Sequence, residues 1–211
     1  KNLGMEGHPS EFGIYLSLIK SNNLHIKNGD DYEFSFKKTK NNSIKIIYEE
    51  FLKLIKNSKE AININDIYAH FVKQPYGIKL GLLPILIGLF FKANESSCAL
   101  YTRDEQGKES LVTEFDQKIA EKLYHLPETL KIMYVKIEGE KQVILNEFKT
   151  YVEKSLLENK IIENPTPLNV LKPIVVKTYQ LPTYAQKTRN YKDKRVLVLR
   201  DELLSAHNPY E

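Results

Sequence analysis

The chain has 211 residues, of which 42% are apolar and 27% charged, and its formal net charge is +4. This length is enough for one large domain or two small ones, and the composition excludes a wholly disordered chain. The single cysteine, Cys98, excludes an internal disulfide framework and an all-cysteine zinc site, and it favours a cytoplasmic location. The first residues contain neither an apolar signal segment nor a methionine start, so we expect a fragment of a longer polypeptide.

Residues 1–40 predict a helix followed by a hairpin. Pro9 suits the first position of a helix over residues 9–21, which carries an apolar stripe at helical spacing: Phe12, Tyr15, Leu16 and Ile19. The pair Asn28-Gly29 is a favoured tight turn between a strand at residues 24–26 and a return strand with apolar residues at 32, 34 and 36. This order matches the second half of a winged helix, so we interpret residues 1–40 as the second half of a truncated winged helix. The polar, lysine-rich residues 37–43 are interpreted as a solvated connector.

Residues 41–140 predict a winged-helix-like domain. Helices are expected over residues 44–58 and 63–72, the second opened by a capping box from Asn63 to Asp66. A turn at residues 74–77 (QPYG) leads into the longest apolar run, residues 80–91, which we interpret as a buried central helix. A hairpin with strands at residues 98–101 and 110–112 follows. A second capping box, from Thr113 to Asp116, then opens an appended helix, and residues 130–137 form an appended strand.

Residues 141–211 predict a C-terminal helical region. An apolar stripe follows residue 141, and further helices are expected over residues 168–179, 184–188 and 194–206. The predicted fold class is therefore α+β, mostly helical, with winged-helix-like units and a C-terminal helical region. The apolar run at residues 80–91 is too short to cross a membrane and contains Pro84, so no membrane contact is expected.

The central helix is poorly suited to reading DNA bases, which requires exposed polar side chains. Its run is apolar on nearly every side, with lysines only at its ends, Lys79 and Lys92. Gly81, Pro84 and Gly88 share one face, which would be flat enough for another element to approach closely. The expected wing, residues 102–109, carries two basic and three acidic side chains, whereas a wing that grips phosphates should be positive.

Basic residues are instead concentrated near the C-terminus, over residues 172–200. Basic side chains interleaved with aromatic ones are typical of nucleic-acid binding, especially to single strands. The alternative interpretation is a solvated helical surface with its tyrosines packed inward. The candidate nucleic-acid contacts are Lys172, Lys177, Lys187, Arg189, Lys192, Lys194, Arg195, Tyr184 and Tyr191.

Catalytic signatures are missing from the sequence. It contains no phosphate-binding loop and no dinucleotide-binding glycine motif, and its histidines lack metal-ligand spacing. Cys98 falls in an expected strand, where a free cysteine usually packs as a small apolar residue. The pairs Asp116-x-Lys118 and Glu158-x-Lys160 resemble half of a metal-dependent nuclease site, but both fall in expected helices. We therefore predict no catalytic residue, cofactor, metal or small-molecule ligand.

Several stretches together resemble a region of large bacterial ATP-binding proteins, of the P-loop type, from phage-defence or DNA-modification gene clusters. The most specific is Pro75-Tyr76-Gly77-Ile78-Lys79-x-Gly81-x-Leu83-Pro84-Ile85-Leu86. The others are Gly4-x-x-Gly7-x-Pro9-x-Glu11 followed by Tyr15, Leu18 and Leu24-His25; Ala99-Leu100-Tyr101; Leu181-Pro182-x-Tyr184-Ala185-x-x-Thr188; and Arg200-Asp201-x-Leu203-Leu204-x-Ala206 with Pro209 after it. The resemblance implies a cytoplasmic location and an ATPase core outside this region. The resemblance identifies no catalytic residue in this chain. Six positions look structural: Pro75, Tyr76, Gly77, Gly81, Pro84 and Gly88.

The expected function is that of a non-catalytic scaffold or interaction module of a larger bacterial ATPase, in phage defence or DNA processing. Its expected partners are other domains of the same longer protein or a subunit of a complex. The alternative is a nucleic-acid-binding module that contacts DNA through the basic C-terminal segment. A cryptic nuclease is the least favoured alternative.

Overall fold

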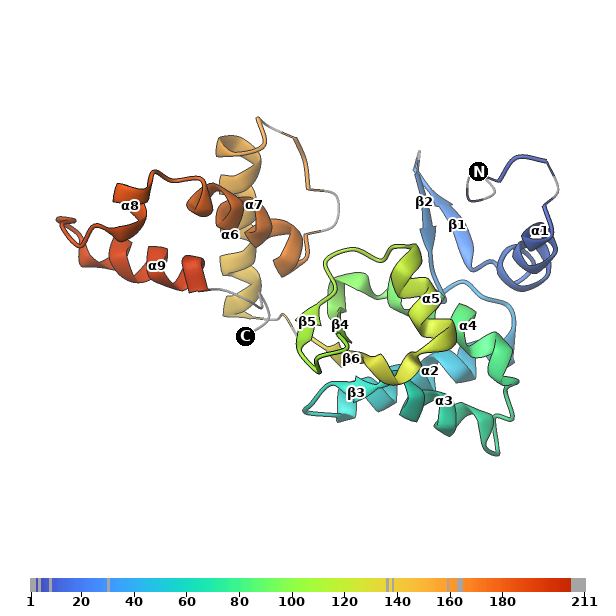
Figure 1. Cartoon of the computed structure of the whole chain (residues 1–211). Coiled ribbons are helices and arrows are strands. Elements are labelled where there is room, and N and C mark those ends of the chain that lie inside the picture. Colours follow the sequence, from blue (N-terminus) through green and yellow to red (C-terminus); the bar gives the residue numbers. More distant parts are fainter. Residues whose placement is uncertain are drawn as a thin grey trace. The chain divides into compact units, whose positions relative to one another are not determined.

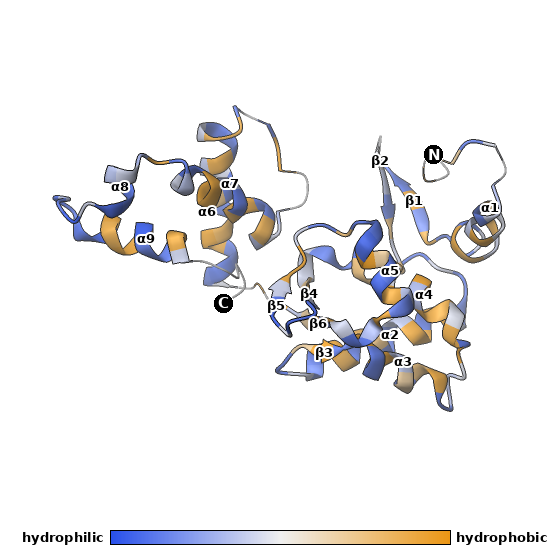
Figure 2. Cartoon of the chain, in the orientation of Figure 1, coloured by the Kyte–Doolittle hydropathy of each residue, from blue (hydrophilic) through white to orange (hydrophobic). Residues whose placement is uncertain are grey.

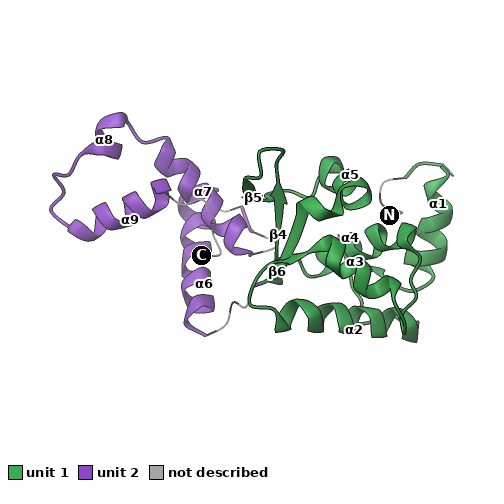
Figure 3. Cartoon of the chain, turned by 60° about the horizontal axis from the view of Figure 1, so that its bottom comes forward, with its two compact units in different colours: residues 1–134 green, residues 135–211 purple. Residues whose placement is uncertain are grey.

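The computed structural model describes residues 3, 5–7, 9–29, 31–135, 137, 139–158, 160–162 and 165–205, with only the backbone of Asp31. The chain forms two compact units, unit 1 over residues 1–134 and unit 2 over residues 135–211 (Figure 3). The fold is α+β and mostly helical, as the sequence predicted. Three positions of the family resemblance, Gly4, Ala206 and Pro209, lie outside the described residues, as does the expected helix end at residue 206.

Unit 1 begins with a short α-helix that continues as a π-helix and leads into a hairpin (Figure 1). These elements are α1 (Glu11–Ile14), η2 (Tyr15–Lys20), β1 (His25–Asn28) and β2 (Asp31–Phe34). Tyr15 and Ile19 of the predicted stripe are buried, whereas Leu16 is exposed. The hairpin register pairs His25 with Phe34 and Lys27 with Tyr32.

Three helices form the centre of unit 1: α2 (Asn42–Asn57), α3 (Ile64–Val72) and α4 (Leu83–Ala93), the last preceded by the 3-10 turn η3 (Leu80–Leu82). The side chain of Asn41 caps α2 by accepting from the Ile44 N–H. Asn63 caps α3 as predicted, but it accepts from the N–H of Asn65. The apolar run of residues 80–91 does not form one continuous α-helix. Regular α-helix begins only at Leu83, and Leu80, in the 3-10 turn before it, is 62% exposed.

A four-stranded antiparallel sheet completes unit 1, with the strand order β3-β6-β4-β5. Its strands are β3 (Ile62–Asn63), β4 (Cys98–Arg103), β5 (Glu109–Leu111) and β6 (Leu130–Tyr134). The expected appended strand is thus an internal strand of the sheet, and β3 was missed by the sequence analysis. The order of elements from α2 to β5 agrees with a winged helix, but β6 lies between β3 and β4, so the winged-helix assignment stays a prediction.

The helix α5 (Gln117–His125) follows β5 and leads through the 3-10 turn η5 into β6. The prediction that a capping box at Thr113 opens this helix was wrong. Asp116 is the N-cap, and its carboxylate accepts from the Ile119 N–H, so the helix starts at Gln117. The remaining 3-10 turns of unit 1 are η4 (Glu95–Ser97) and η5 (Pro127–Thr129).

The core of unit 1 is built around Phe51, Phe71 and Phe90, all fully buried. Phe36, which follows the hairpin, stacks on Tyr48 with ring centroids 4.6 Å apart and also contacts Phe90. Residues before 41 therefore share one core with α2 and α4. The structure has one compact unit where the sequence suggested two, and the expected boundary at residue 40 lies inside it.

Unit 2 consists of the helices α6 (Glu140–Ser155), α7 (Pro167–Tyr179), α8 (Thr183–Lys187) and α9 (Lys194–Ser205). Its buried apolar core is small, with Leu145, Val152, Ile162 and Val170 at its centre. Among the described residues of the whole chain, no helix combines the length and the apolar character that crossing a bilayer requires.

Candidate interaction sites

An open apolar groove lies in unit 1 between α4 and α5, next to the end of β2, with a volume of about 300 Å³. Its lining is almost entirely apolar, and Lys92 is the charged residue among the lining side chains that the structure describes. The lining residues are Phe34, Pro84, Ile85, Gly88, Leu89, Lys92, Phe115, Ala120, Leu123 and Tyr124. A preformed apolar concavity of this kind is typical of a binding surface.

Gly81 in η3 and Gly88 in α4 face side chains of the opposite wall of this groove. A Cβ atom added to Gly88 would meet Phe115 Cζ at 3.5 Å and Leu123 Cδ1 at 3.7 Å. Gly81 faces the hydroxyl of Tyr124, which donates a hydrogen bond of 3.4 Å to the Gly81 carbonyl. The face of Gly81, Pro84 and Gly88 is therefore the face on which α5 packs. The sequence signal for the other wall was the i, i+3, i+4 spacing of Ala120, Leu123 and Tyr124 in α5.

The turn at residues 74–77 carries the first three residues of the predicted structural motif. Its Gln74–Pro75 peptide bond is cis, and Gly77 has a φ of +59°, a left-handed conformation that favours glycine. The Tyr76 ring packs on Phe71 and His70, with centroids 5.2 and 5.3 Å away. The pKa of Tyr76 is raised, first by loss of solvation and then by the carboxylate of Glu50. These contacts anchor the turn that precedes the groove.

At the wing between β4 and β5, the carboxylate of Glu109 pairs with two basic side chains. Arg103 donates to Glu109 Oε1 at 2.6 Å, and Lys131 Nζ lies 2.5 Å from the same oxygen. These two partners, Lys131 first, hold the pKa of Glu109 below its usual value. Arg103 is thus engaged within the sheet, and that this wing does not grip phosphates stays a prediction.

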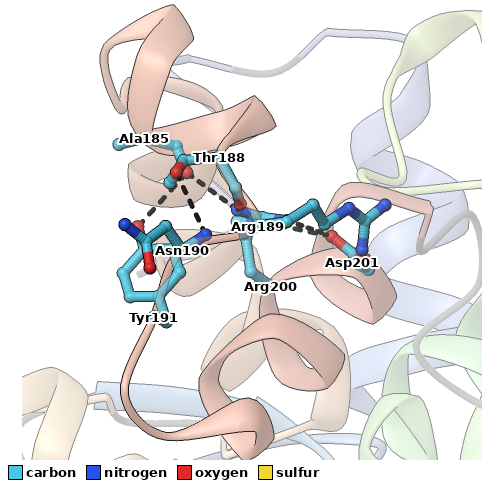
Figure 4. Close-up of polar contacts among 7 residues, drawn as sticks. All are labelled: Ala185, Thr188, Arg189, Asn190, Tyr191, Arg200 and Asp201. Atoms are coloured by element: carbon cyan, nitrogen blue, oxygen red, sulfur yellow. Dashed lines mark hydrogen bonds and ion pairs between the residues drawn. The ribbon is translucent and has the colours of Figure 1, made fainter.

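The basic C-terminal segment is organised by Arg200, which is only 5% exposed (Figure 4). Its guanidinium donates to the carbonyls of Ala185 and Thr188 at 3.0 and 2.6 Å, and to Asp201 at 2.7 Å. The hydrogen bond from Arg200 is the largest cause of a lowered pKa at Asp201. We call this group the Arg200 cluster; it ties α8 and the segment after it to α9.

Both arginines predicted to contact nucleic acid are paired with carboxylates. Arg189 bonds to Asp201, and Arg195 bonds to Asp193 with a shortest distance of 2.8 Å. Tyr191 is partly buried, its hydroxyl donating to the Ala185 carbonyl and its ring lying 5.8 Å from the Arg200 guanidinium. Arg189 and Arg195 are therefore exposed side chains engaged in surface ion pairs, and Tyr191 packs within unit 2.

The other predicted contacts are exposed. Tyr184 is 77% exposed, and the exposed lysines are Lys172, Lys177, Lys187, Lys192 and Lys194. Lys172 and Lys177 lie in α7, Lys187 ends α8, Lys192 lies between α8 and α9, and Lys194 starts α9. Within the described residues none of these lysines is in an ion pair, whereas Arg189 and Arg195 are paired with carboxylates.

Residues with catalytic chemistry are not gathered anywhere in the described parts of the chain. No group of three or more His, Cys, Asp or Glu side chains there could hold a metal ion. Cys98 is 2% exposed, and burial raises the pKa of its thiol to about 12, which opposes nucleophilic chemistry. Asp116 of the nuclease-like pair serves as the cap of α5.

Comparison with known proteins identified no relative: no protein-family model, curated protein or solved structure matches this chain.

Proposed function

We propose that this chain is a non-catalytic scaffold or interaction module of a larger bacterial ATPase, working in phage defence or DNA processing. The observation that carries the proposal is the open apolar groove beside α4. The groove has the size of a few apolar side chains and almost no polar lining, so it suits an apolar segment of another domain better than a polar substrate. The context of an ATPase and of defence comes from the sequence resemblance alone.

Unit 2 adds a second surface with the same character. On α9, Val196, Val198 and Leu199 are 46%, 62% and 52% exposed, whereas the buried core of the unit is small. The ribbon of α9 contains hydrophobic stretches (Figure 2). Exposed apolar residues gathered on one short helix are typical of a surface that is covered by a partner. A scaffold that joins domains needs such surfaces and needs no catalytic group.

The groove can be tested by a charge placed on its wall. Ile85→Asp should weaken association of the chain with the other domains of the full-length protein, expressed separately, by at least about tenfold, because an unpaired charge would be buried. Ile46→Asp is the matched control, since Ile46 lies on α2, is 49% exposed and does not line the groove. Equal effects of the two substitutions, with both variants folded, would argue against the groove.

Catalytic inactivity needs its own measurement. The isolated chain should neither bind nor hydrolyse ATP, and it should leave duplex and single-stranded DNA intact in magnesium or manganese. Turnover of ATP or cleavage of DNA that persists through purification would refute a non-catalytic module.

A further inference from the structure

The lysine-rich segment that the sequence suggested to be a solvated connector is an ordered part of unit 1. Phe36 immediately before it is 3% exposed and stacked in the core. Asn41 at its end caps α2, and the Asn41 side chain also donates to Asn22 Oδ1 at 3.0 Å. That bond joins residues 37–41 to the turn after η2, so two segments distant in sequence share one surface.

This surface carries exposed lysines from both segments. Lys20 lies at the end of η2, two residues before Asn22, and Lys37, Lys38 and Lys40 lie in the loop; all four are exposed. Residues 34–48 contain no acidic side chain, and neither do residues 12–29. Within the described parts of the chain, none of these four lysines is in an ion pair. We call Lys20, Lys37, Lys38 and Lys40 the lysine face.

The chemistry of the lysine face distinguishes among anionic partners. Lysine ammonium groups suit phosphates as point charges, and they give affinity without reading bases. Among the aromatic residues nearest in sequence, Phe36 and Tyr48 are packed against each other, and the Tyr48 hydroxyl bonds to Asn94, so neither is available to stack on a base. Phe34 and Tyr32 pack against the His25 ring, with centroids 5.3 and 4.9 Å away, and of these two only Tyr32 is exposed. With Tyr32 as the one exposed ring among these four, the surface lacks a row of stacking aromatic residues and favours the dense phosphates of a duplex over a single strand.

We infer that the lysine face binds the phosphate backbone of duplex DNA, without sequence preference, and that it does so independently of the C-terminal basic segment. This inference goes beyond the proposed scaffold role and does not depend on it. It places the nucleic-acid contact in unit 1, on the opposite end of the sequence from the segment that composition alone favoured.

The test is a fluorescence-anisotropy titration of the whole chain with a labelled 20-base-pair duplex in 50 to 200 mM salt. If all four lysines contact phosphates, the slope of log K against log salt should be roughly −3 to −4. The triple variant Lys37→Glu/Lys38→Glu/Lys40→Glu should weaken binding at least about tenfold and make the slope shallower. A Lys→Gln triple variant at the same positions should give a smaller loss in the same direction.

Two controls carry the same change in net charge. Lys59→Glu/Lys73→Glu/Lys79→Glu alters exposed lysines elsewhere in unit 1, and Lys187→Glu/Lys192→Glu/Lys194→Glu alters the C-terminal segment. Both should bind within about threefold of wild type. Absence of duplex binding at 50 mM salt would overturn the inference, as would an equal loss in either control. Because this readout is DNA affinity and not domain association, its failure leaves the scaffold proposal standing.

Discussion

Arg200 shows how a single residue can be misassigned when only its charge is known. In sequence it belongs to a basic run, but in the structure it is the buried centre of the Arg200 cluster. A guanidinium has five donors in a fixed plane, so it can satisfy two carbonyls and a carboxylate at once, which lysine cannot do with the same geometry. Its role is therefore to hold α8 and the segment after it to α9.

Removing this residue should destabilise unit 2 strongly. Arg200→Leu leaves the Thr188 carbonyl without its side-chain donor and removes one of the two side-chain donors of the Ala185 carbonyl, and we expect a loss of about 2–3 kcal/mol in the free energy of unfolding of unit 2. The measurement is hydrogen exchange of α8 and α9 amides. Arg195→Leu is the control, because that side chain is 92% exposed and bonds only to neighbouring Asp193. A similar loss of protection in both variants would contradict the cluster's role.

At the scale of elements, Gly88 in α4 and Gly77 in the turn at residues 74–77 differ in what a side chain at each position would meet. Gly88 has ordinary helical geometry, and an added Cβ would make only contacts of normal length with Phe115 and Leu123. Gly77 has open space around it but a φ of +59°, which a residue with a Cβ adopts only at a cost. A methyl group therefore fits at Gly88, whereas the backbone conformation opposes one at Gly77.

Replacing each by alanine should therefore have opposite effects on stability. Gly88→Ala should stabilise unit 1 by about 0.5–1 kcal/mol, because alanine favours the helix and fits its site. Gly77→Ala should destabilise unit 1 by roughly 1 kcal/mol. Chemical denaturation of both variants gives the comparison. Destabilisation by Gly88→Ala would mean that α5 cannot accommodate even one methyl group on this face.

The same elements show why part of the fold was predictable. The helices α2, α3 and α7 and the hairpin β4–β5 follow from periodicity and local turn signals, which act within a few residues. The strand β3 is only two residues long, and Ile62 pairs with Ile132, which is far away in the sequence. No local sequence pattern therefore indicates this strand. The cap at Asp116 was missed because Thr113 offers an equally good local signal.

At the scale of the whole molecule, the groove and the lysine face share one reason for escaping sequence analysis. Each is formed by segments far apart in the chain: Phe34 with Ile85 and Tyr124 in the groove, and Lys20 with Lys40 in the lysine face. Composition could locate a basic run only where it was continuous in sequence. It could not reveal that arginines in that run were already paired, or that a shorter lysine loop was held against a second segment.

The division into two units gives a last prediction for the molecule as a whole. Cys98 is the single cysteine, and it is buried in β4 of unit 1. If the units unfold separately, Arg200→Leu should loosen unit 2 while Cys98 stays as slow to react with an alkylating reagent as in wild type. Gly77→Ala should instead speed the reaction roughly fivefold, the population effect of about 1 kcal/mol when opening is at equilibrium. Fast labelling of Cys98 in Arg200→Leu would show that the two units unfold as one.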